Sequence, residues 1–374
     1  MISVVTAMAA SAANPVAEVK KNVAPDSRQV VFEVSLDTLP SGEFVLRGVT
    51  SEQTAKDAMT ARLRADGLTF ADSLRVYPSD SRGLVMIPAA SLRTRPAHSA
   101  EMATQAVMGT PVRILEHTGE MYRIQTPDGY IAYVPDSSIK AMTAEEMDAW
   151  RDAADRRVVT AYWQTRAYTT PEATGPRDVV TDLVAGAIVR TDPADIRNGR
   201  IRVTTPDGRQ GWADAAALTP IDEWAAQEFD AQKILDMAYS MEGTPYLWGG
   251  TSTKAIDCSG LVKVSYLGNG LILMRDASQQ ALTGQKLDPA SWQDFKAADL
   301  MFFGNAETGR ITHVALYDNS GRYVHSSGRV KRNSVDPASP DWLYSPIAAV
   351  RIHGSEGTPG IVRAKDHPWY FNLK

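Results

Sequence analysis

The feature that most restricts the fold is an internal repeat. Residues 123–129 read RIQTPDG and residues 202–208 read RVTTPDG, and the likeness continues where residues 132–134 (AYV) align with residues 211–213 (GWA). Each copy reads as a strand, a Pro-Asp-Gly turn and a second strand, which is the pattern of a β-hairpin. Because an apolar strand also precedes each hairpin, we predict two small all-β barrels, over residues 85–142 and 158–221.

The segments around the repeat follow other patterns. A capping box at residues 143–146 (TAEE) predicts a helical connector over 143–157. Strand alternation and one helical stretch predict a small α+β unit over 30–82. An amphipathic helix over 224–241, a second helix that carries the cysteine and later alternating strands predict a larger α+β domain over 225–374.

Two expectations concern the N-terminus. Residues 14–29 are polar, and we expect a flexible segment there. Residues 1–13 are apolar and small, and Ala10-Ser11-Ala12 fits an A-x-A cleavage pattern. This pattern indicates the remnant of a signal peptide, so we expect an exported, periplasmic or extracellular protein.

Composition excludes several classes of function. The 374-residue chain has one cysteine, which rules out an intramolecular disulfide framework and a cysteine-rich zinc site. Its net charge is −5 without a basic patch, so we expect no nucleic-acid partner. No stretch approaches the roughly 18 apolar residues of a membrane span, so we expect no stable membrane insertion. We also expect a monomer that uses no metal and no other cofactor.

The single cysteine lies in a context that favours chemistry. Asp257 is a good N-cap residue and would place Cys258 in the first turn of a helix. Free amide groups and the partial positive charge of that helix end favour the thiolate, which is the nucleophilic form. The backbone N–H of Cys258 could help to hold an oxyanion.

Two histidines on neighbouring strands could serve the sulfur. His313 lies in an alternating stretch, residues 311–317, where it shares a face with Ala315 and Tyr317. We predict that this strand packs on the cysteine helix and presents His313 to Cys258 as a base. His325, on the next strand, could bind the far nitrogen of His313 and fix its tautomer.

The combined motifs resemble those of the NlpC-type cysteine peptidases. They occur in that family's order, at residues 246–250 (YLWGG), 257–262 (DCSGLV), 312–317 (THVALY) and 324–326 (VHS). The resemblance covers about residues 225–374 and implies a papain-like fold that cleaves cell-wall peptides, chiefly after γ-linked D-glutamate. It implies Cys258 as nucleophile, His313 as base and His325 as orienting residue, with Tyr246 lining the nucleophile pocket and Trp248 the substrate cleft.

The domain order resembles one branch of this family more closely. An N-terminal unit, two SH3-like domains and an NlpC-type domain are similar to the dipeptidyl-peptidase VI branch, which removes L-Ala-γ-D-Glu from released murein peptides with a free N-terminus. The resemblance implies an anionic pocket for the substrate ammonium group, made by Glu101 of the first barrel and by Asp276. An aromatic residue of the first barrel would complete the wall; Tyr133 fits by spacing, and Tyr122 and Tyr130 remain open.

Other interpretations stay open at this point. Asp257 and Ser259 are also candidate substrate-binding residues, Ser259 through the D-glutamate carboxylate, although both suit helix capping. Asp276 could instead cap the helix that follows it, and Glu101 could be a solvated loop charge. The protein could alternatively be a peptidoglycan-binding module or a cell-wall amidase on the same fold. The third residue of the stem peptide, diaminopimelate or lysine, is not determined by the sequence.

Overall fold

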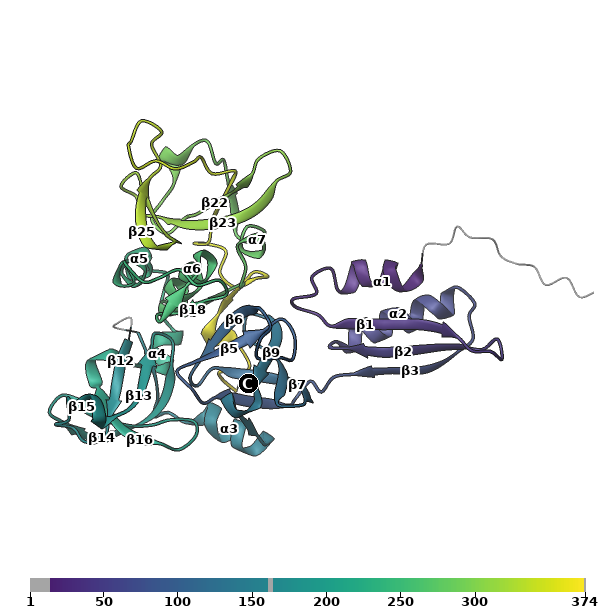
Figure 1. Ribbon diagram of the computed structural model, residues 1–374, viewed down its shortest axis with the longest axis horizontal. Coiled ribbons are helices and arrows are strands. Elements are labelled where there is room, and N and C mark those ends of the chain that lie inside the picture. Colours follow the sequence, from purple (N-terminus) through teal and green to yellow (C-terminus); the bar gives the residue numbers. More distant parts are fainter. Residues whose placement is uncertain (1–13, 161–163, 373–374) are drawn as a thin grey trace, which may run out of the picture. The chain divides into compact units, whose positions relative to one another are not determined.

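The computed structural model describes residues 14–160 and 164–372. The chain forms two compact units, Met1–Ser79 and Asp80–Lys374, each of which is described by itself (Figure 1). The predicted signal-peptide remnant, residues 1–13, lies outside the described residues. The multidomain fold class expected from the sequence is confirmed: an α+β catalytic domain, two all-β barrels and an α+β N-terminal unit.

The first unit is a three-stranded sheet with two helices. The strands β1 (Phe32–Thr38), β2 (Phe44–Thr50) and β3 (Phe70–Val76) lie in this order, β1 antiparallel and β3 parallel to β2. The parallel pair requires a crossover, which α2 (Gln53–Ala65) provides. Met59 and Leu63 of this helix are fully buried with Leu46 of the central strand.

The prediction of a flexible segment over 14–29 is wrong for residues 15–23. These residues form the helix α1 (Pro15–Val23), which begins with Asn14 as N-cap and Pro15 in the first turn. Val19 is buried in the core of the unit, with Val16 and Val23 packed beside it. These valines have helical spacing, but the lysines and the glutamate between them make the segment read as polar.

The two barrels have the same topology. The first contains β4 (Arg82–Val85), β5 (Ala89–Arg93), β6 (Met102–Val107), β7 (Pro111–Thr118), β8 (Met121–Gln125), β9 (Ile131–Pro135) and β10 (Ile139–Met142), in the order β10-β4-β7-β8-β9-β5-β6. The second contains β11 (Arg156–Val159), β12 (Gln164–Tyr168), β13 (Val179–Val184), β14 (Ile188–Arg197), β15 (Arg200–Thr204), β16 (Gln210–Asp214) and β17 (Leu218–Pro220), in the order β17-β11-β14-β15-β16-β12-β13. Strand by strand, the second order repeats the first, so the repeat extends beyond the hairpins that reveal it.

The repeated turn has one geometry in both barrels. Gly129 and Gly208 have φ values of 85° and 88°, a region that glycine adopts at low cost. Their amides donate to Thr126 and Thr205 at 2.8 and 2.9 Å respectively. The first barrel begins at Arg82, because β4 pairs with β10 there, three positions before the boundary that the pattern suggested.

The connector helix is shorter than the sequence predicted. The helix α3 (Ala144–Asp152) begins with the expected capping box between Thr143 and Glu146. It does not continue to residue 157, because residues 156–159 form the strand β11, which pairs with β14 and β17. The helix ends early because the residues that follow it pair within this sheet.

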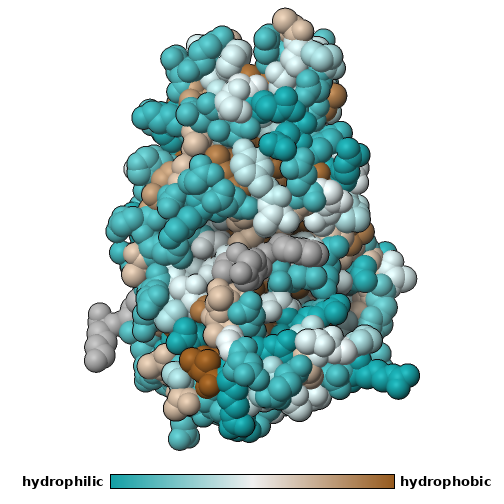
Figure 2. Space-filling view, turned by 90° about the vertical axis from the view of Figure 1, so that its left-hand side faces the viewer, coloured by the Kyte–Doolittle hydropathy of each residue, from teal (hydrophilic) through white to brown (hydrophobic). Residues whose placement is uncertain are grey.

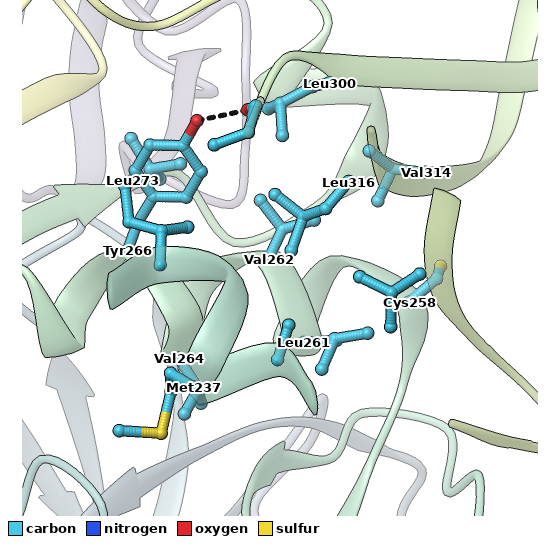
Figure 3. Packing of buried hydrophobic residues seen from close by; sticks show 14 of the residues in the cluster. Met237, Cys258, Leu261, Val262, Val264, Tyr266, Leu273, Leu300, Val314 and Leu316 are labelled. Atoms are coloured by element: carbon cyan, nitrogen blue, oxygen red, sulfur yellow. Dashed lines mark hydrogen bonds between the residues drawn. The ribbon is translucent and has the colours of Figure 1, made fainter. Parts of the chain in front are cut away.

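The catalytic domain packs helices against an antiparallel sheet. Its main sheet has the order β21-β26-β22-β23-β24-β25, with bounds Gln285–Leu287, Ala348–Arg351, Leu300–Asn305, Arg310–Tyr317, Arg322–Ser327 and Arg329–Ser334. The helix α6 (Cys258–Gly268) packs on one face of it, where Leu261 and Val262 join the core that contains Val314 and Leu316 of β23 (Figure 3). Tyr266 anchors the far end of the helix, since its hydroxyl donates to the Ala298 carbonyl at 2.6 Å.

The helix expected over 224–241 is two helices. They are α4 (Ile221–Ala225) and α5 (Ala231–Ser240). The second begins at Asp230, whose carboxylate accepts hydrogen bonds from the amides of Gln232 and Lys233. This N-cap starts a new helix after a short break in the apolar pattern.

The C-terminal tail joins the catalytic domain to both barrels. After β27 (Ile361–Arg363), which pairs with β20 (Leu271–Leu273), the chain runs to the barrels. There the buried guanidinium of Arg156 donates to the Tyr370 carbonyl at 2.7 Å. On the other side, the ring of His367 binds the Pro127 carbonyl at 3.0 Å. The tail is therefore part of the interface between three domains.

The surface is mainly polar. The face drawn in Figure 2 is covered mostly by hydrophilic residues, with apolar ones scattered among them. Within the described residues, none of the helices is long and apolar enough to cross a membrane. The exposed large apolar side chains are few in the described chain, and they are Ile196, Leu247, Trp248, Leu282 and Tyr344.

Candidate active site

Cys258 is the first residue of α6, and its side chain is almost completely buried. Its exposed fraction is 8%. The backbone amides of Ser259 and of Val314, the residue after His313, are directed to the sulfur and favour its anion. Burial has the larger effect, and with the charge of Asp257 it raises the pKa of the Cys258 thiol to about 11. The sequence suggested that the helix end favours the thiolate of Cys258. Because burial outweighs this effect, the helix end alone does not keep the thiol ionised in the resting protein.

A buried ion pair lies directly beneath this cysteine. Arg275 donates from one terminal nitrogen to Asp257 Oδ2 at 2.6 Å and from the other to Asp257 Oδ1 at 3.2 Å. Asp257 also caps α6, accepting from the Gly260 amide at 2.7 Å, and it accepts from the Gly249 amide at 3.0 Å. Both side chains are nearly fully buried, so the pair fixes the start of the helix to the chain on either side.

Asp257 and Ser259, two of the candidate substrate-binding residues, are both buried. The Ser259 hydroxyl binds Asp257 at 3.2 Å and accepts from Arg275 at 2.8 Å, and Ser259 is buried. Both side chains are engaged by protein groups inside the domain. Their contacts hold the first turn of α6 and with it Cys258.

The two histidines form a relay with a third residue. His313 Nε2 lies 2.8 Å from His325 Nδ1, and His325 Nε2 lies 2.9 Å from Asn333 Oδ1. The amide nitrogen of Asn333 donates to the Asp341 carbonyl at 2.5 Å, which turns its oxygen toward His325. His325 must then carry its proton on Nε2, and His313 must donate from its own Nε2. This leaves the lone pair of His313 on Nδ1, the nitrogen free to act as a base.

The outer face of the sheet holds this relay. His313 shares a face with Ala315 and Tyr317 as predicted, and those two residues pack away from the α6 core. The ring of His313 lies 5.8 Å from that of Phe303 on the same side. The strand packs on the cysteine helix as predicted, and its Val314 amide is directed to the sulfur.

The relay makes stability depend on pH. Burial, the largest cause, lowers the pKa of His313 from 6.5 to about 3 and that of His325 to about 4. Between these lowered pKa values and pH 6.5, the two histidines bind more protons in the unfolded chain than in the folded one. The folded state is therefore most stable, with respect to these histidines, above pH 6.5, and it loses stability as the pH falls. We expect the free energy of unfolding to fall with a slope that approaches about 1.4 kcal/mol per pH unit for each histidine.

Urea denaturation between about pH 7 and pH 4.5 measures this slope. Replacing both relay histidines by glutamine should remove their share of it. His117→Gln is the matched control, because this histidine is exposed and pairs with Asp136 on the first barrel. Equal slopes in the wild type and the double variant would contradict the neutral relay.

A residue of the first barrel reaches the segment that precedes the cysteine. Trp248 is 62% exposed, and its indole N–H donates to Glu101 Oε1 at 2.7 Å. Glu101 ends the long loop between β5 and β6. Next to it, the Met102 carbonyl approaches Gly249 so closely that a Cβ there would lie 2.4 Å from the oxygen. Glycine at 249 is thus required for the barrel loop to lie against the catalytic domain.

Polar contacts hold the barrel in that position. Arg275 donates from Nε to Thr104 Oγ1 at 2.8 Å, so the buried ion pair continues into the barrel. The Gln105 amide donates to Thr251 Oγ1 at 2.7 Å, and the Thr251 amide donates back to Gln105 Oε1 at 3.0 Å. The loop that carries Glu101 is therefore anchored at its base to the strand beside the cysteine helix.

The remaining candidates take different places. Tyr246 lies near the sulfur, since burial first and then the charges of Cys258 and Asp257 raise the pKa of its phenol to about 12. Asp276 caps the short helix α7 (Ala277–Gln280), and its carboxylate lies 3.9 Å from Arg275, the cation that binds Asp257.

Of the barrel aromatics, Tyr133 is placed in line with the loop. It pairs with Arg93, and Arg93 pairs with Met102, the residue after Glu101. The ring of Tyr122 lies against that of His117 in a tilted arrangement with centroids 4.6 Å apart, and Tyr130 is buried in the core of the barrel. The structure thus leaves Tyr133 as the aromatic whose strand adjoins the loop.

Sequence reasoning missed Arg275 and Asn333. Arg275 stood next to Asp276 in the motif, but only the fold shows that its charge is buried against Asp257. Asn333 follows His325 by eight positions on the next strand, and hairpin register would have placed it near the histidine. In the part of the chain that is described, no group of three or more His, Cys, Asp or Glu residues is arranged to hold a metal ion.

Comparisons with known proteins agree with this geometry. Residues 243–349 match the NlpC/P60 family, and residues 92–139 match the bacterial dipeptidyl-peptidase SH3 domain. Dipeptidyl-peptidase 6 of Lysinibacillus sphaericus is 28% identical over 280 residues, which are 72% of this chain and 96% of that protein. Gamma-D-glutamyl-L-lysine dipeptidyl-peptidase of Bacillus subtilis is 36% identical over 160 residues, which are 42% of this chain and 52% of that protein.

A solved structure shares the fold. The crystal structure of an NlpC/P60 family protein from Bacillus cereus superposes with a TM-score of 0.62 at 19% sequence identity. The match covers 72% of this chain and 99% of that one.

Proposed function

We propose that this chain, which carries a cysteine peptidase domain of the NlpC/P60 family and a bacterial dipeptidyl-peptidase SH3 domain, hydrolyses the γ-D-glutamyl–diamino acid bond of peptidoglycan stem peptides. Its substrates would be released peptides with a free N-terminal L-Ala, and its product L-Ala-γ-D-Glu. Such an activity belongs to cell-wall peptide recycling or turnover, and we propose an exported protein for it. The observation that carries the proposal is the hydrogen bond between Glu101 of the barrel and Trp248 beside the nucleophile segment.

The proposed chemistry starts from a neutral pair. The pKa of the Cys258 thiol is raised and that of His313 is lowered, so the protein rests as thiol and imidazole. As the sulfur attacks the γ-carbonyl carbon, His313 Nδ1 takes the thiol proton, and the Cys258 amide would help to hold the oxyanion. The C–N bond then breaks, His313 protonates the leaving amine, and a thioester remains on the sulfur. Water activated by His313 hydrolyses this thioester and restores the thiol.

The relay supports this role of His313. His325 accepts from His313 Nε2–H, and Asn333 accepts from His325, so the base keeps one tautomer through the reaction. The partial positive charge that develops on His313 is spread toward the amide oxygen of Asn333. We propose positioning roles for His325 and Asn333 on this ground.

Glu101 and Asp276 would form the site of the substrate ammonium group. A buried ammonium needs an anionic partner, because an unpaired charge is costly to desolvate. We propose that Glu101 supplies this partner at the end of the cleft that the barrel loop closes, with Asp276 on the catalytic domain and Tyr133 on the barrel strand beside the loop. A longer peptide or an acylated L-Ala would not fit at such an end.

The requirement for a free amine tests the proposal. We expect N-acetylation of L-Ala-γ-D-Glu-diaminopimelate to lower kcat/KM by about 100-fold or more, because it removes the charge and adds bulk. Glu101→Gln should lower kcat/KM for the free peptide by about 10–100-fold and leave the acetylated peptide unaffected. Mass spectrometry of the released L-Ala-γ-D-Glu measures both.

Glu172→Gln is the matched control, because Glu172 lies in the corresponding loop of the second barrel and binds Asn198 at 3.0 Å. Equal cleavage of both peptides would keep the peptidase and discard the ammonium pocket. Cleavage at the sugar–peptide junction would show an amidase, and binding without turnover would show a peptidoglycan-binding module.

A further inference from the structure

The strand β25 places a lysine beside the histidine relay. Lys331 is the direct partner of His325 across β24 and β25, and residues directly opposite in an antiparallel pair project from the same face. Asn333, two positions further along β25, lies on this face too and accepts the hydrogen bond of His325. The charge of Lys331 is close enough to contribute to the lowered pKa of both His313 and His325.

This ammonium has no carboxylate partner among the described residues, whereas Arg332 and Arg322 each have one. Arg332, on the opposite face of the strand, pairs with Glu242 at 3.3 Å, and Arg322 pairs with Asp341 at 2.7 Å. A lone cation beside the catalytic base opposes the imidazolium that the reaction has to form. The arrangement favours catalysis only if an anion joins the lysine when substrate binds.

The proposed reaction supplies such an anion. His313 gives its proton to the leaving amine, so the leaving diamino acid must lie on the histidine side of the sulfur. The α-carboxyl carbon of that residue is two bonds from the amine nitrogen. It is a carboxylate when the diamino acid is the last residue of the peptide and a neutral amide when the peptide continues.

We propose that Lys331 binds a carboxylate of the leaving diamino acid and thereby selects peptides that present one there. This inference rests on the proposed function. Two sources share the chemistry: the α-carboxylate of a C-terminal diamino acid, and the distal carboxylate of diaminopimelate.

The surface next to the relay is open enough for this residue. Tyr344 is 49% exposed, and its ring lies edge-on to that of Phe303 with centroids 5.7 Å apart. Phe303 in turn contacts His313. The aliphatic part of a diamino acid could pack on this aromatic wall while its carboxylate meets Lys331.

Three peptides test the inference in the full-length protein. They are L-Ala-γ-D-Glu-L-Lys, its C-terminal amide, and the corresponding diaminopimelate peptide amidated at its α-carboxyl group. We expect the wild type to cleave the lysine acid about 10-fold or more faster than the lysine amide, as kcat/KM. In Lys331→Met this ratio should fall to about one, and Lys331→Arg should restore it. If the distal carboxylate is the partner, the wild type will instead prefer the diaminopimelate amide to the lysine amide, and Lys331→Met will remove that preference.

Arg332→Met is the control, since this residue has the same charge on the opposite face. An unchanged ratio in Lys331→Met overturns the inference. So does an equal rise or fall for all three peptides, because an effect through the histidines alone cannot depend on the substrate's charge. Absence of turnover of every peptide by the wild type overturns the proposed function, and the inference falls with it. Cleavage of all three peptides at equal rates by the wild type overturns the inference alone.

Discussion

We expect Cys258→Ala to lower kcat/KM for L-Ala-γ-D-Glu-diaminopimelate, the proposed substrate, by at least about 10⁴-fold, because the variant can form no thioester. The remaining rate should equal that of water attacking a bound peptide. His313→Ala should cost nearly as much, and combining the two changes should add little, since nucleophile and base act as one unit. Measurement of released dipeptide by mass spectrometry over hours gives the range that such low rates require.

Two controls separate chemistry from folding. His117→Ala removes an exposed histidine of the first barrel and should leave kcat/KM within about two-fold. Thermal unfolding of Cys258→Ala should stay close to the wild type, because the side chain lost is small. Turnover that survives in Cys258→Ala at more than a hundredth of the wild-type rate would remove Cys258 from the role of nucleophile.

Arg275→Met produces the largest loss of stability that we expect. It leaves Asp257 as a buried carboxylate without its cation, and such a change costs about 3–5 kcal/mol. Activity should fall as well, because Asp257 holds the first turn of α6 and therefore the sulfur. Calorimetry of the whole protein measures the unfolding temperature of the catalytic domain beside that of the other domains.

The comparison with an exposed pair gives this experiment its control. Arg166→Met breaks an ion pair with Asp182 on the surface of the second barrel and should change stability far less, because water screens an exposed pair. Adding Asp257→Asn to Arg275→Met should recover part of the loss, because no buried charge is then left unpaired. A variant Arg275→Met as stable as Arg166→Met would show that water enters the site freely.

The residues that make covalent or proton chemistry could be named from the sequence, while their supports could not. Cys258, His313 and His325 stand in short motifs, and alternation along residues 311–317 predicted the shared face of His313 and Ala315. Their chemical roles stay predictions until variants are measured. The repeat and its turns also predicted the hairpin of each barrel and the apolar strand before it, which are β7, β8 and β9 in the first barrel and β14, β15 and β16 in the second.

The predictions that failed concerned burial and contacts between residues that are far apart in the sequence but close in the fold. The resting state of Cys258 depends on its burial, which helix-end reasoning does not include. Arg275 gains its role from Asp257, 18 positions away, and from Thr104 in another domain. Local pattern misled in smaller ways too: α3 ends at Asp152 because β11 belongs to a sheet, and α1 forms because valines find a core that their polar neighbours hide.

The repeated turn makes different contacts in the two barrels. In the first copy Asp128 pairs with Lys263 of the cysteine helix at 2.7 Å, and the Pro127 carbonyl binds His367 of the tail. In the second copy Asp207 pairs with its neighbour Arg209 at 2.7 Å. The first turn therefore binds the cysteine helix and the tail, while the second binds within its own barrel and, through Arg209, the Met86 carbonyl of the first barrel. Under the role proposed for Glu101, recombination that exchanged the two barrels would preserve every strand and still abolish activity, since only the first barrel carries the loop of Glu101.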